Sequence, residues 1–312
     1  QTDSNLDAFM IDELVAHPTN NDRFFACSQG GMYRSDDVGE TWERLLPPPG
    51  VPSFGVAWIA FSPLDPTLGL VGTGGWHEPD TGQGIYRTTD GGTTFTKIEE
   101  TGIPEDTVIS SIAFDPDDGT VYASTTAGLF RSTDNGATFT KLSFAFRHDQ
   151  GQWIGIAGSG TSKVFWYVLY TLGEDADLNS RAGGIYRSAD AADWTEITGH
   201  PLVNDDESLE LMRPLGARAH SSNPSTLFLN LRTDGGEGGL WRYNGEWTDI
   251  ALTVVDNTWS EGSGFFGFAP ECLHINRDDP NLMISCNEKA IFLTRDAGSS
   301  WEQLSTRMVG QD

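Results

Sequence analysis

The sequence predicts an all-β fold, a six-bladed β-propeller of four-stranded antiparallel blades. Three observations predict it. A Gly-x-Tyr-Arg run followed by Ser/Thr-x-Asp-x-Gly-x-Thr and an aromatic residue recurs, with variations, six times in 312 residues. The recurrences are 44 to 55 residues apart, a period that suits one propeller blade. Helical periodicity never persists, and no apolar run approaches the ~20 residues of a membrane span. The closing aromatic residues are Trp42, Phe95, Phe139, Trp194, Trp247 and Trp301.

The second half of each copy predicts a tight turn between two strands. In the copy that ends at Phe139, the Asp134 carboxylate can accept bonds from turn N–H groups, and Gly136 can adopt a positive φ. Phe139 then supplies a large apolar ring for packing between neighbouring sheets. We expect the same structural role for the matching residues Asp37, Gly39, Trp42, Asp90, Gly92, Phe95, Asp190, Trp194, Asp296, Gly298 and Trp301.

A second shared pattern lies upstream of each turn. Alternating apolar residues at 109–114 and 121–124 flank a Pro/Asp/Gly turn at 115–119, which indicates a β-hairpin. Each repeat is therefore expected to hold four short antiparallel strands, and the whole chain, 1–312, one propeller domain. The predicted blades are 9–46, 54–99, 107–143, 152–198, 210–251 and 268–305.

These turns resemble the Asp-box, or BNR repeat, of a β-propeller superfamily, and the resemblance covers almost the whole chain. Members include sialidases, xyloglucan-cleaving endoglucanases, sortilin-type receptors and photosystem assembly factors, so the resemblance implies the fold and leaves the activity open. In such propellers the boxes lie on the face away from the binding site. The resemblance therefore implies that the repeated turns are scaffold.

Charge narrows the class of partner. Asp and Glu total 45 against 19 Lys and Arg, a formal net charge of −26. A field of this sign repels nucleic acid and anionic membranes, so we expect neither nucleic-acid binding nor membrane insertion. The composition suits either a salt-rich habitat or an ordinary acidic secreted protein. A start at Gln1, without an initiator Met, fits an exported, extracytoplasmic chain whose signal was removed, or a trimmed one.

Three cysteines allow two interpretations. Cys272 and Cys286 are placed evenly about the predicted turn at 278–280, so they could face each other across one hairpin and be bridged. Cys27 has the place in the first blade that Cys286 has in the last. The alternative is three small buried thiols without a function.

Binding residues are expected where the blades differ. Five arginines recur at one position and are interpreted as scaffold: Arg34, Arg87, Arg131, Arg187 and Arg242. The connections between blades and the loops between second and third strands share one rim, where irregular segments combine aromatic and charged residues. The predicted ligand-binding residues are Trp76, His77, Asp80, Arg147, His148, Trp153, Arg181, Arg213, Arg232, Trp259 and Glu261.

One rim loop could hold calcium. Asp175, Asp177 and Asn179 place hard oxygen ligands at the spacing of a calcium loop, although Ser180 stands where a calcium loop has Gly. The alternative is a solvated acidic loop, and no other cofactor is predicted.

Whether the chain is an enzyme stays open at this point. If it is a glycoside hydrolase, two carboxyl groups must flank the scissile bond, and Glu78, Asp149 and Glu210 are the acids to test first. The Arg-Ile-Pro element of sialidases has only Gly102-Ile103-Pro104 as a counterpart. Residues 27–34 resemble the segment of xyloglucan-cleaving enzymes that contains the base, but they include no Asp.

The leading hypothesis is therefore an exported, non-catalytic propeller that binds a glycan, peptide or protein partner at its irregular rim. The first alternative is a glycoside hydrolase or polysaccharide lyase of unassigned specificity. The second is an assembly factor for a membrane complex. A pocket that holds two close carboxyl groups, one of them with a raised pKa, would favour the enzyme.

Overall fold

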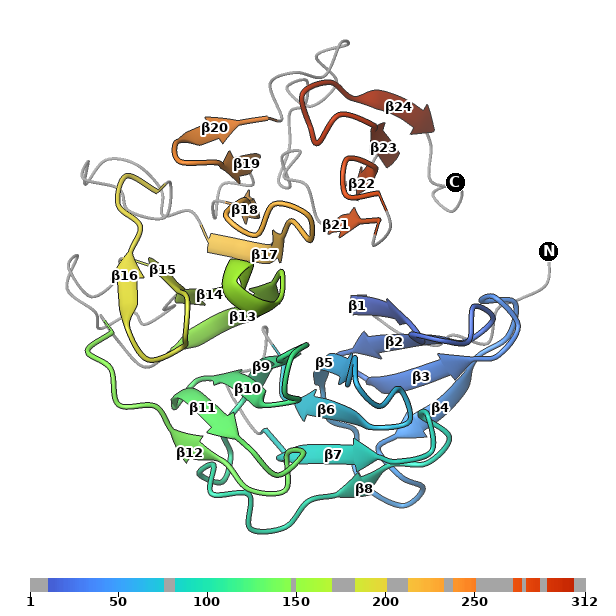
Figure 1. Cartoon of the computed structure of the whole chain (residues 1–312). Coiled ribbons are helices and arrows are strands. Elements are labelled where there is room, and N and C mark those ends of the chain that lie inside the picture. Colours follow the sequence, from blue (N-terminus) through green and yellow to red (C-terminus); the bar gives the residue numbers. More distant parts are fainter. Residues whose placement is uncertain are drawn as a thin grey trace. The chain divides into compact units, whose positions relative to one another are not determined.

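The computed structural model describes residues 11–75, 82–146, 150–169, 183–200, 213–232, 238–250, 272–276, 279–286 and 291–305. Within these ranges the strands form six four-stranded antiparallel sheets, and the single helical turn is a 3-10 turn at Gly160–Ser162 (Figure 1). The fold is a six-bladed β-propeller, as the sequence predicts. The Cα positions group into two compact units, residues 1–154 and 155–312, which are described separately. That the whole chain is one domain stays a prediction.

The first unit contains blades 1 to 3, in which each strand pairs with the next one in the chain. Blade 1 consists of β1 (Ile11–Ala16), β2 (Phe24–Ser28), β3 (Gly31–Ser35) and β4 (Glu43–Leu46); blade 2 of β5 (Val56–Phe61), β6 (Gly69–Thr73), β7 (Ile85–Thr88) and β8 (Thr96–Lys97); and blade 3 of β9 (Ile109–Phe114), β10 (Val121–Thr125), β11 (Gly128–Ser132) and β12 (Thr140–Lys141).

Blades 4 to 6 follow. The first strand of blade 4, β13, begins one residue before the predicted start of this blade, and it spans the division between the two units. Blade 4 consists of β13 (Gly151–Ala157), β14 (Val164–Leu169), β15 (Gly184–Ser188) and β16 (Trp194–Glu196); blade 5 of β17 (Arg213–Ala219), β18 (Leu227–Arg232), β19 (Gly238–Tyr243) and β20 (Trp247–Asp249); and blade 6 of β21 (Cys272–Ile275), β22 (Met283–Cys286), β23 (Ile291–Thr294) and β24 (Glu302–Ser305).

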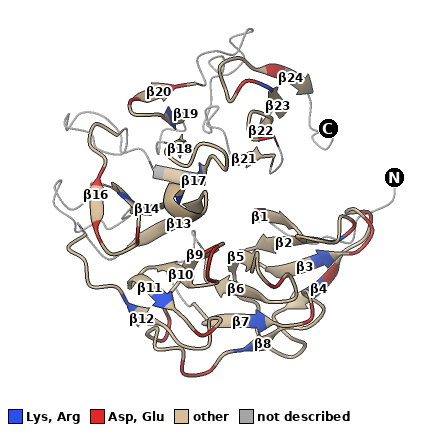
Figure 2. Cartoon of the chain, in the orientation of Figure 1, with Lys and Arg blue, Asp and Glu red and all other residues tan. Residues whose placement is uncertain are grey.

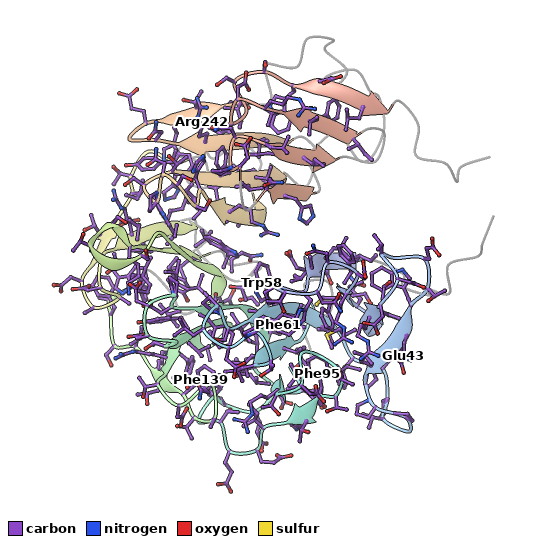
Figure 3. The ribbon with its side chains drawn as sticks, turned by 45° about the vertical axis from the view of Figure 1, so that its right-hand side comes forward. Glu43, Trp58, Phe61, Phe95, Phe139 and Arg242 are labelled. Carbon is purple, nitrogen blue, oxygen red and sulfur yellow. The ribbon has the colours of Figure 1, made fainter. Side chains whose placement is uncertain are left out.

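Neighbouring blades pack through their inner strands and their aromatic residues. In the first unit β1 contacts β5 and β5 contacts β9, and in the second unit β17 contacts β21. Trp58 of β5 donates from Nε1 to the carbonyl of Ile112 in β9 across 3.0 Å (Figure 3). Leu70, Ile109 and Phe139 belong to one core cluster that spans blades 2 and 3. Burying such large side chains between sheets supplies the main stabilisation of each interface.

The first strands carry β-bulges at equivalent places. The register with the second strand slips at Asp12 in β1, Ala57 in β5, Ser110 in β9 and Leu215 in β17. A bulge leaves one residue without a partner in the ladder and re-aims its side chain. Bulges at matching positions show that the four strands share one backbone design, in which side chains of different chemistry are placed.

Strand order gives each blade two distinct ends. Because the four strands run antiparallel in sequence, turns between second and third strands lie at the end where the chain enters and leaves the blade. This end is called the rim below. The other end carries the turns between first and second and between third and fourth strands, and is called the turn side.

The turns between third and fourth strands have the geometry expected from their residue types. Asp134 accepts bonds from the Ser132 hydroxyl at 2.7 Å, the Thr138 hydroxyl at 2.6 Å and the Thr138 N–H at 2.9 Å. Gly136 has φ +77°. The Ser132 and Thr138 hydroxyls and the Thr138 N–H lower the pKa of Asp134 to about 2. Equivalent carboxylate contacts are made by Asp37, Asp90, Asp190 and Asp296.

Recurring arginines bind the turn of the following blade. Arg34 of blade 1 donates to the carbonyls of Gly92 and Thr93 in blade 2, at 3.0 and 3.2 Å. Arg242 of blade 5 donates to the carbonyl of Ala297 in blade 6 at 3.0 Å. Figure 2 shows the basic residues of β3, β7 and β11 in blue. These contacts support the interpretation of Arg34 and Arg242 as scaffold residues.

The cysteines occupy related places in the first and last blades. Cys27 in β2 is fully buried and free, and its register partner in β3 is Met32. Cys286 in β22 pairs with Ile291 in β23, the equivalent position, and with Cys272 in β21. The backbone therefore sets Cys272 and Cys286 directly opposite each other, as the sequence predicts.

Candidate functional site

Most of the residues predicted to bind ligand lie outside the described part of the chain. Of that set the structure places three. Arg213 and Arg232 are register partners at the rim end of β17 and β18, so the fold brings these two predicted residues together. The predicted ligand-binding residues, candidate acids and calcium ligands that lie outside the described residues are Trp76, His77, Glu78, Asp80, Arg147, His148, Asp149, Asp175, Asp177, Asn179, Arg181, Glu210, Trp259 and Glu261.

The third placed residue, Trp153, is buried. It lies in β13 with a side chain that is only 6% exposed. The strand around it is held to β9, because Ser110 Oγ donates to the Gly151 carbonyl at 2.7 Å and Ser111 Oγ accepts the Ile154 N–H at 2.8 Å. The ring of Trp153 is therefore buried instead of standing exposed on the rim.

Among the described residues, Asp12 at the bulge of β1 is a carboxyl group whose pKa is strongly raised. Burial, together with the neighbouring charge of Glu13, raises the pKa of Asp12 to about 7. Its Oδ2 atom is buried and has no hydrogen-bond partner in the described structure. A carboxyl group that keeps its proton near neutral pH can act as a general acid.

Cys27 shares this environment. It is the register partner of Glu13, and its pKa is raised by burial and then by the charges of Glu13 and Asp12. Asp12, Glu13 and Cys27 therefore form a cluster, called the bulge cluster below, at the rim end of blade 1. A buried thiol of this kind is mostly neutral and unreactive at physiological pH.

The turn beside the bulge cluster is rigid. Ser28, the register partner of Ile11, donates from Oγ to the Gly31 carbonyl at 2.9 Å and accepts the Gly30 N–H at 3.2 Å. Arg44 donates to the Gly30 carbonyl at 2.8 Å. No Asp occurs in residues 27–34, and the Ser28 hydroxyl is engaged in holding the turn. The neighbouring acid that the fold provides is therefore Asp12, which sequence reasoning missed.

A comparison of the blades in three dimensions identifies Asp12 as an exception. The bulge position carries Ala57 in blade 2, Ser110 in blade 3 and Leu215 in blade 5, so an acid there departs from the scaffold chemistry. The alignment of bulges is not visible in the sequence, because β1 lacks the motif residues that mark the turns.

The rim of the first unit also has a hollow of about 530 Å³, lined by residues of β7, of β8 and of the connection from β8 to β9. Thr73 anchors this region by donating from Oγ1 to the Gly84 carbonyl at 2.6 Å and accepting the Gln83 N–H at 2.7 Å. The Gly82 backbone forms an isolated bridge with Asp106. Among the lining residues, those with charged side chains are Lys97, Glu99, Glu100, Glu105 and Asp106.

This rim hollow offers mainly oxygen acceptors. Glu100 and Asp106 have positive φ values of 53° and 60°, so the connection between blades 2 and 3 is held in a conformation that non-glycine residues seldom adopt. Backbone strain of this kind occurs at functional sites more often than elsewhere. Carboxylates on a fixed backbone can accept hydrogen bonds from the hydroxyl groups of a ligand.

The described residues contain no group of three His, Cys, Asp or Glu side chains that could hold a metal ion. The predicted calcium ligands lie outside these residues, so the calcium site stays a prediction. Likewise, no helix within the described ranges is long and apolar enough to cross a membrane.

Comparisons with known proteins find similarity to xyloglucanases. No protein-family profile matches it. A xyloglucanase from Paenibacillus sp. is 37% identical over an alignment that covers 28% of this chain and 10% of the relative. The GH74 xyloglucanase from Xanthomonas campestris superposes with a TM-score of 0.68 at 17% identity, covering 95% of this chain and 47% of the enzyme. The chain thus spans less than half the length of these relatives.

A second kind of propeller is also similar in structure. YCF48 from Cyanidioschyzon merolae superposes with a TM-score of 0.57 at 12% identity, covering 95% of this chain and 85% of that protein. A related structure is YCF48 bound to a D1 peptide, with a TM-score of 0.55. At these identities the superpositions establish the propeller fold alone.

Proposed function

We propose that this protein is an exported Asp-box propeller that binds a neutral glycan of the xyloglucan class at its rim. The observation that carries the proposal is the acceptor-lined rim hollow in the first unit, where Glu99, Glu105 and Asp106 surround a space of about 530 Å³. This volume lies within the range of small-ligand sites, roughly 300–1,000 Å³. Carboxylate acceptors suit a ligand whose surface is covered with hydroxyl donors.

The charge and the comparisons support a neutral glycan over other ligands. A net charge of −26 repels polyanions, whereas an uncharged polysaccharide is not affected. Sequence similarity to a xyloglucanase, combined with superposition on a GH74 xyloglucanase, supports xyloglucan as the first ligand to test. A polysaccharide such as xyloglucan does not enter cells, so a protein that binds it is expected outside the cell. This expectation supports the proposal that the chain is exported.

Affinity electrophoresis in gels that contain soluble xyloglucan tests the proposal. We expect the protein to be retarded, and Asp106→Asn to weaken retardation about 5-fold or more, because the amide cannot replace the carboxylate as a double acceptor. Asn also tolerates the positive φ of Asp106, so the backbone is retained. Glu40→Gln, an exposed acid on the turn side, is the matched control. Equal migration with and without xyloglucan would reject the proposal.

A second candidate function is hydrolysis of the bound glycan, and Asp12 favours it. A proton donor for glycoside cleavage needs a raised pKa, and Asp12 has one of about 7 beside the carboxylate of Glu13. Asp12 Oδ2 also has no hydrogen-bond partner in the described structure, so a proton on this atom could be donated to a glycosidic oxygen.

Release of reducing ends from xyloglucan tests this candidate. If the protein is a hydrolase, Asp12→Asn should lower kcat at least about 100-fold, because an amide cannot donate the proton. Activity should fall as pH rises through about 7, where Asp12 loses its proton. Asp22→Asn, on the turn side of the same blade, is the control. Retardation without any release of reducing ends would leave binding as the function and reject hydrolysis.

A further inference from the structure

The repeated turn between third and fourth strands is shortened in blades 4 and 5, and it is shortest in blade 5. There β19 and β20 are joined only by Asn244, Gly245 and Glu246. The Asn244 N–H donates to the Glu246 carbonyl at 3.1 Å, and Gly245 has φ +88°. The carboxylate and hydroxyl that organise the full turns are absent from this short one, so blade 5 lacks the standard turn-side contact.

Full turns fill the space against the preceding blade. A Cβ placed on Gly92 of blade 2 would lie 2.2 Å from the ring of Phe25 in blade 1, and one on Gly298 of blade 6 would lie 2.4 Å from Ile250 in blade 5. At the junction of blades 4 and 5, the ring of Tyr243 instead meets Trp166 edge-on, with centroids 5.8 Å apart.

The arginine contact is changed at the same junction. Arg34 and Arg242 donate to turn carbonyls of the next blade, but Arg187 of blade 4 has no full turn ahead of it. Arg187 donates to Ser225 Oγ at 2.8 Å and lies 5.7 Å from the ring centroid of Trp166. Arg187 therefore bonds to the first hairpin of blade 5 instead of to a turn between third and fourth strands.

Two adjoining hollows open where the full turn is missing, and both are lined by residues of the second unit. The first, of about 450 Å³, is lined by Tyr243 and Trp247 together with Glu196, Thr198 and Glu246. The second, of about 600 Å³, is lined by Arg187, Asp193 and Ser225 among others, and Ile197 lines both. These two hollows are called the turn-side groove.

The groove has an aromatic wall with an unused hydrogen-bond donor. The rings of Tyr243 and Trp247 are 5.1 Å apart at their centroids and tilted by 48°. Trp42 and Trp194 donate from Nε1 to carbonyls in their own turns, those of Gly39 and Ala191. Trp247 Nε1 is buried and has no acceptor in the described structure.

We propose that the turn-side groove is a second carbohydrate site, which binds a neutral oligosaccharide with one sugar ring against Tyr243 and Trp247. The apolar face of a sugar packs on aromatic rings, while its hydroxyl groups bind the Glu196 and Glu246 carboxylates. Arg187 and Ser225 line the continuation of the groove for a further sugar unit. A peptide could use the same aromatic wall, but acids and hydroxyls predominate among the polar residues here. This site is separate from the rim hollow, and the proposal goes beyond rim binding.

Fluorine NMR of protein labelled with 5-fluorotryptophan tests the site directly. The Trp247 resonance is assigned as the one missing from Trp247→Phe, and the Trp301 resonance as the one missing from Trp301→Phe. Trp301 is the matched control, because its Nε1 also has no acceptor but its side chain is only 4% exposed within a core cluster. Cellotetraose, xylotetraose and mannotetraose serve as probes, each added up to about 10 mM, a range that detects millimolar affinity.

We expect at least one tetrasaccharide to shift the Trp247 resonance saturably and to leave that of Trp301 unmoved. Glu246→Gln should weaken this affinity about 3-fold to 10-fold without changing the unfolding midpoint, because the Glu246 side chain is exposed. Replacing Asn244–Glu246 with the sequence of the full turn at 36–41 should fill the groove and abolish the shift.

Two outcomes would overturn the proposal: no tetrasaccharide moves the Trp247 resonance, or only a basic peptide does. Xyloglucan retardation of the variant with the replaced turn separates the two sites, because that variant keeps the Trp247 resonance. If this variant is still retarded but has lost the groove affinity, the rim proposal stands. If xyloglucan does not retard the parent protein but a tetrasaccharide shifts its Trp247 resonance, only the groove proposal stands.

Discussion

Arg34 reaches from blade 1 to blade 2, where its Nη1 donates to the carbonyl oxygen of Gly92 across 3.0 Å. The same guanidinium pairs with Asp36 at 2.8 Å and with Glu43 at 2.9 Å, and its side chain is only 11% exposed. Arg34 therefore joins two blades and orients the acids of its own blade at once. Glu43 lies on β4 at the outer edge of blade 1 (Figure 3).

We predict that Arg34→Met lowers the free energy of unfolding by about 2–3 kcal/mol, because it removes charge-assisted bonds to the Gly92 and Thr93 carbonyls. Urea denaturation measures the change. Arg44→Met is the control: Arg44 is exposed and bonds only to a turn within its own blade and to Ser53, so its removal should cost less than about 1 kcal/mol. Equal losses for the two variants would contradict the proposed bridge between blades.

Asp12 makes stability depend on pH in the direction opposite to that of most acids. Its pKa is raised from 3.8 to about 7 in the folded protein, so folding keeps a proton that the unfolded chain releases. Its contribution to stability is complete below pH 4 and is lost as pH rises through about 7.

Asp12→Asn should remove that loss. We predict that the variant matches the parent protein near pH 4 and exceeds it at pH 8 by on the order of 2–4 kcal/mol, since about 1.4 kcal/mol corresponds to each pKa unit. Urea midpoints recorded from pH 4 to pH 8 check this. A parent protein whose stability does not decline relative to Asp12→Asn across that range would show that Asp12 ionises normally.

The repeats predicted the fold because their chemistry is local. In the turn around Asp134, the Ser132 hydroxyl, the Asp134 carboxylate and Gly136 lie within five residues. Nearly all the interactions that form the turn are therefore local in the sequence. The period between such turns then sets the number of blades. The predicted scaffold role of Arg34 is visible in its bonds to the next blade, although the acceptors lie 58 and 59 residues away.

The candidate sites were harder to predict, because they depend on how blades differ in three dimensions. The Asp12 pKa comes from burial at a bulge, and no spacing in the sequence marks that bulge. Trp153 was expected on the rim because of its charged neighbours, yet its side chain is buried. The short turn at 244–246 was visible in the sequence, but the hollows beside it depend on the missing contacts of a neighbouring blade.

Cys272 and Cys286 are predicted to form a disulfide across the first hairpin of blade 6. Their Cα atoms are direct register partners, and opposite positions in antiparallel strands are about 4.5–5.5 Å apart, within the range of disulfides. Cys27 is a free thiol in the structure.

Alkylation of the unfolded protein, followed by mass spectrometry, tests the assignment. We expect one alkylated cysteine, Cys27, before reduction and all three after it. Native protein should show none, because Cys27 is fully buried and its raised pKa keeps the thiol protonated. Three alkylated cysteines without prior reduction would show that the pair is reduced, in agreement with the alternative of three buried thiols.

Replacement of Gly136 in blade 3 is predicted to be strongly destabilising. Its φ of +77° costs an alanine about 1–2 kcal/mol, and the added Cβ would lie 2.4 Å from Leu70 Cδ1, a fully buried side chain of blade 2. Because Leu70 has little room to move, overpacking adds about 1–3 kcal/mol, and Gly136→Ala should cost about 2–5 kcal/mol in total. Gly50→Ala separates the two effects, since Gly50 has φ +88° but nothing within 4 Å of the added Cβ. It should cost only the backbone strain. Thermal unfolding of both variants measures the difference, and equal costs would mean that the turn of blade 3 does not press on blade 2.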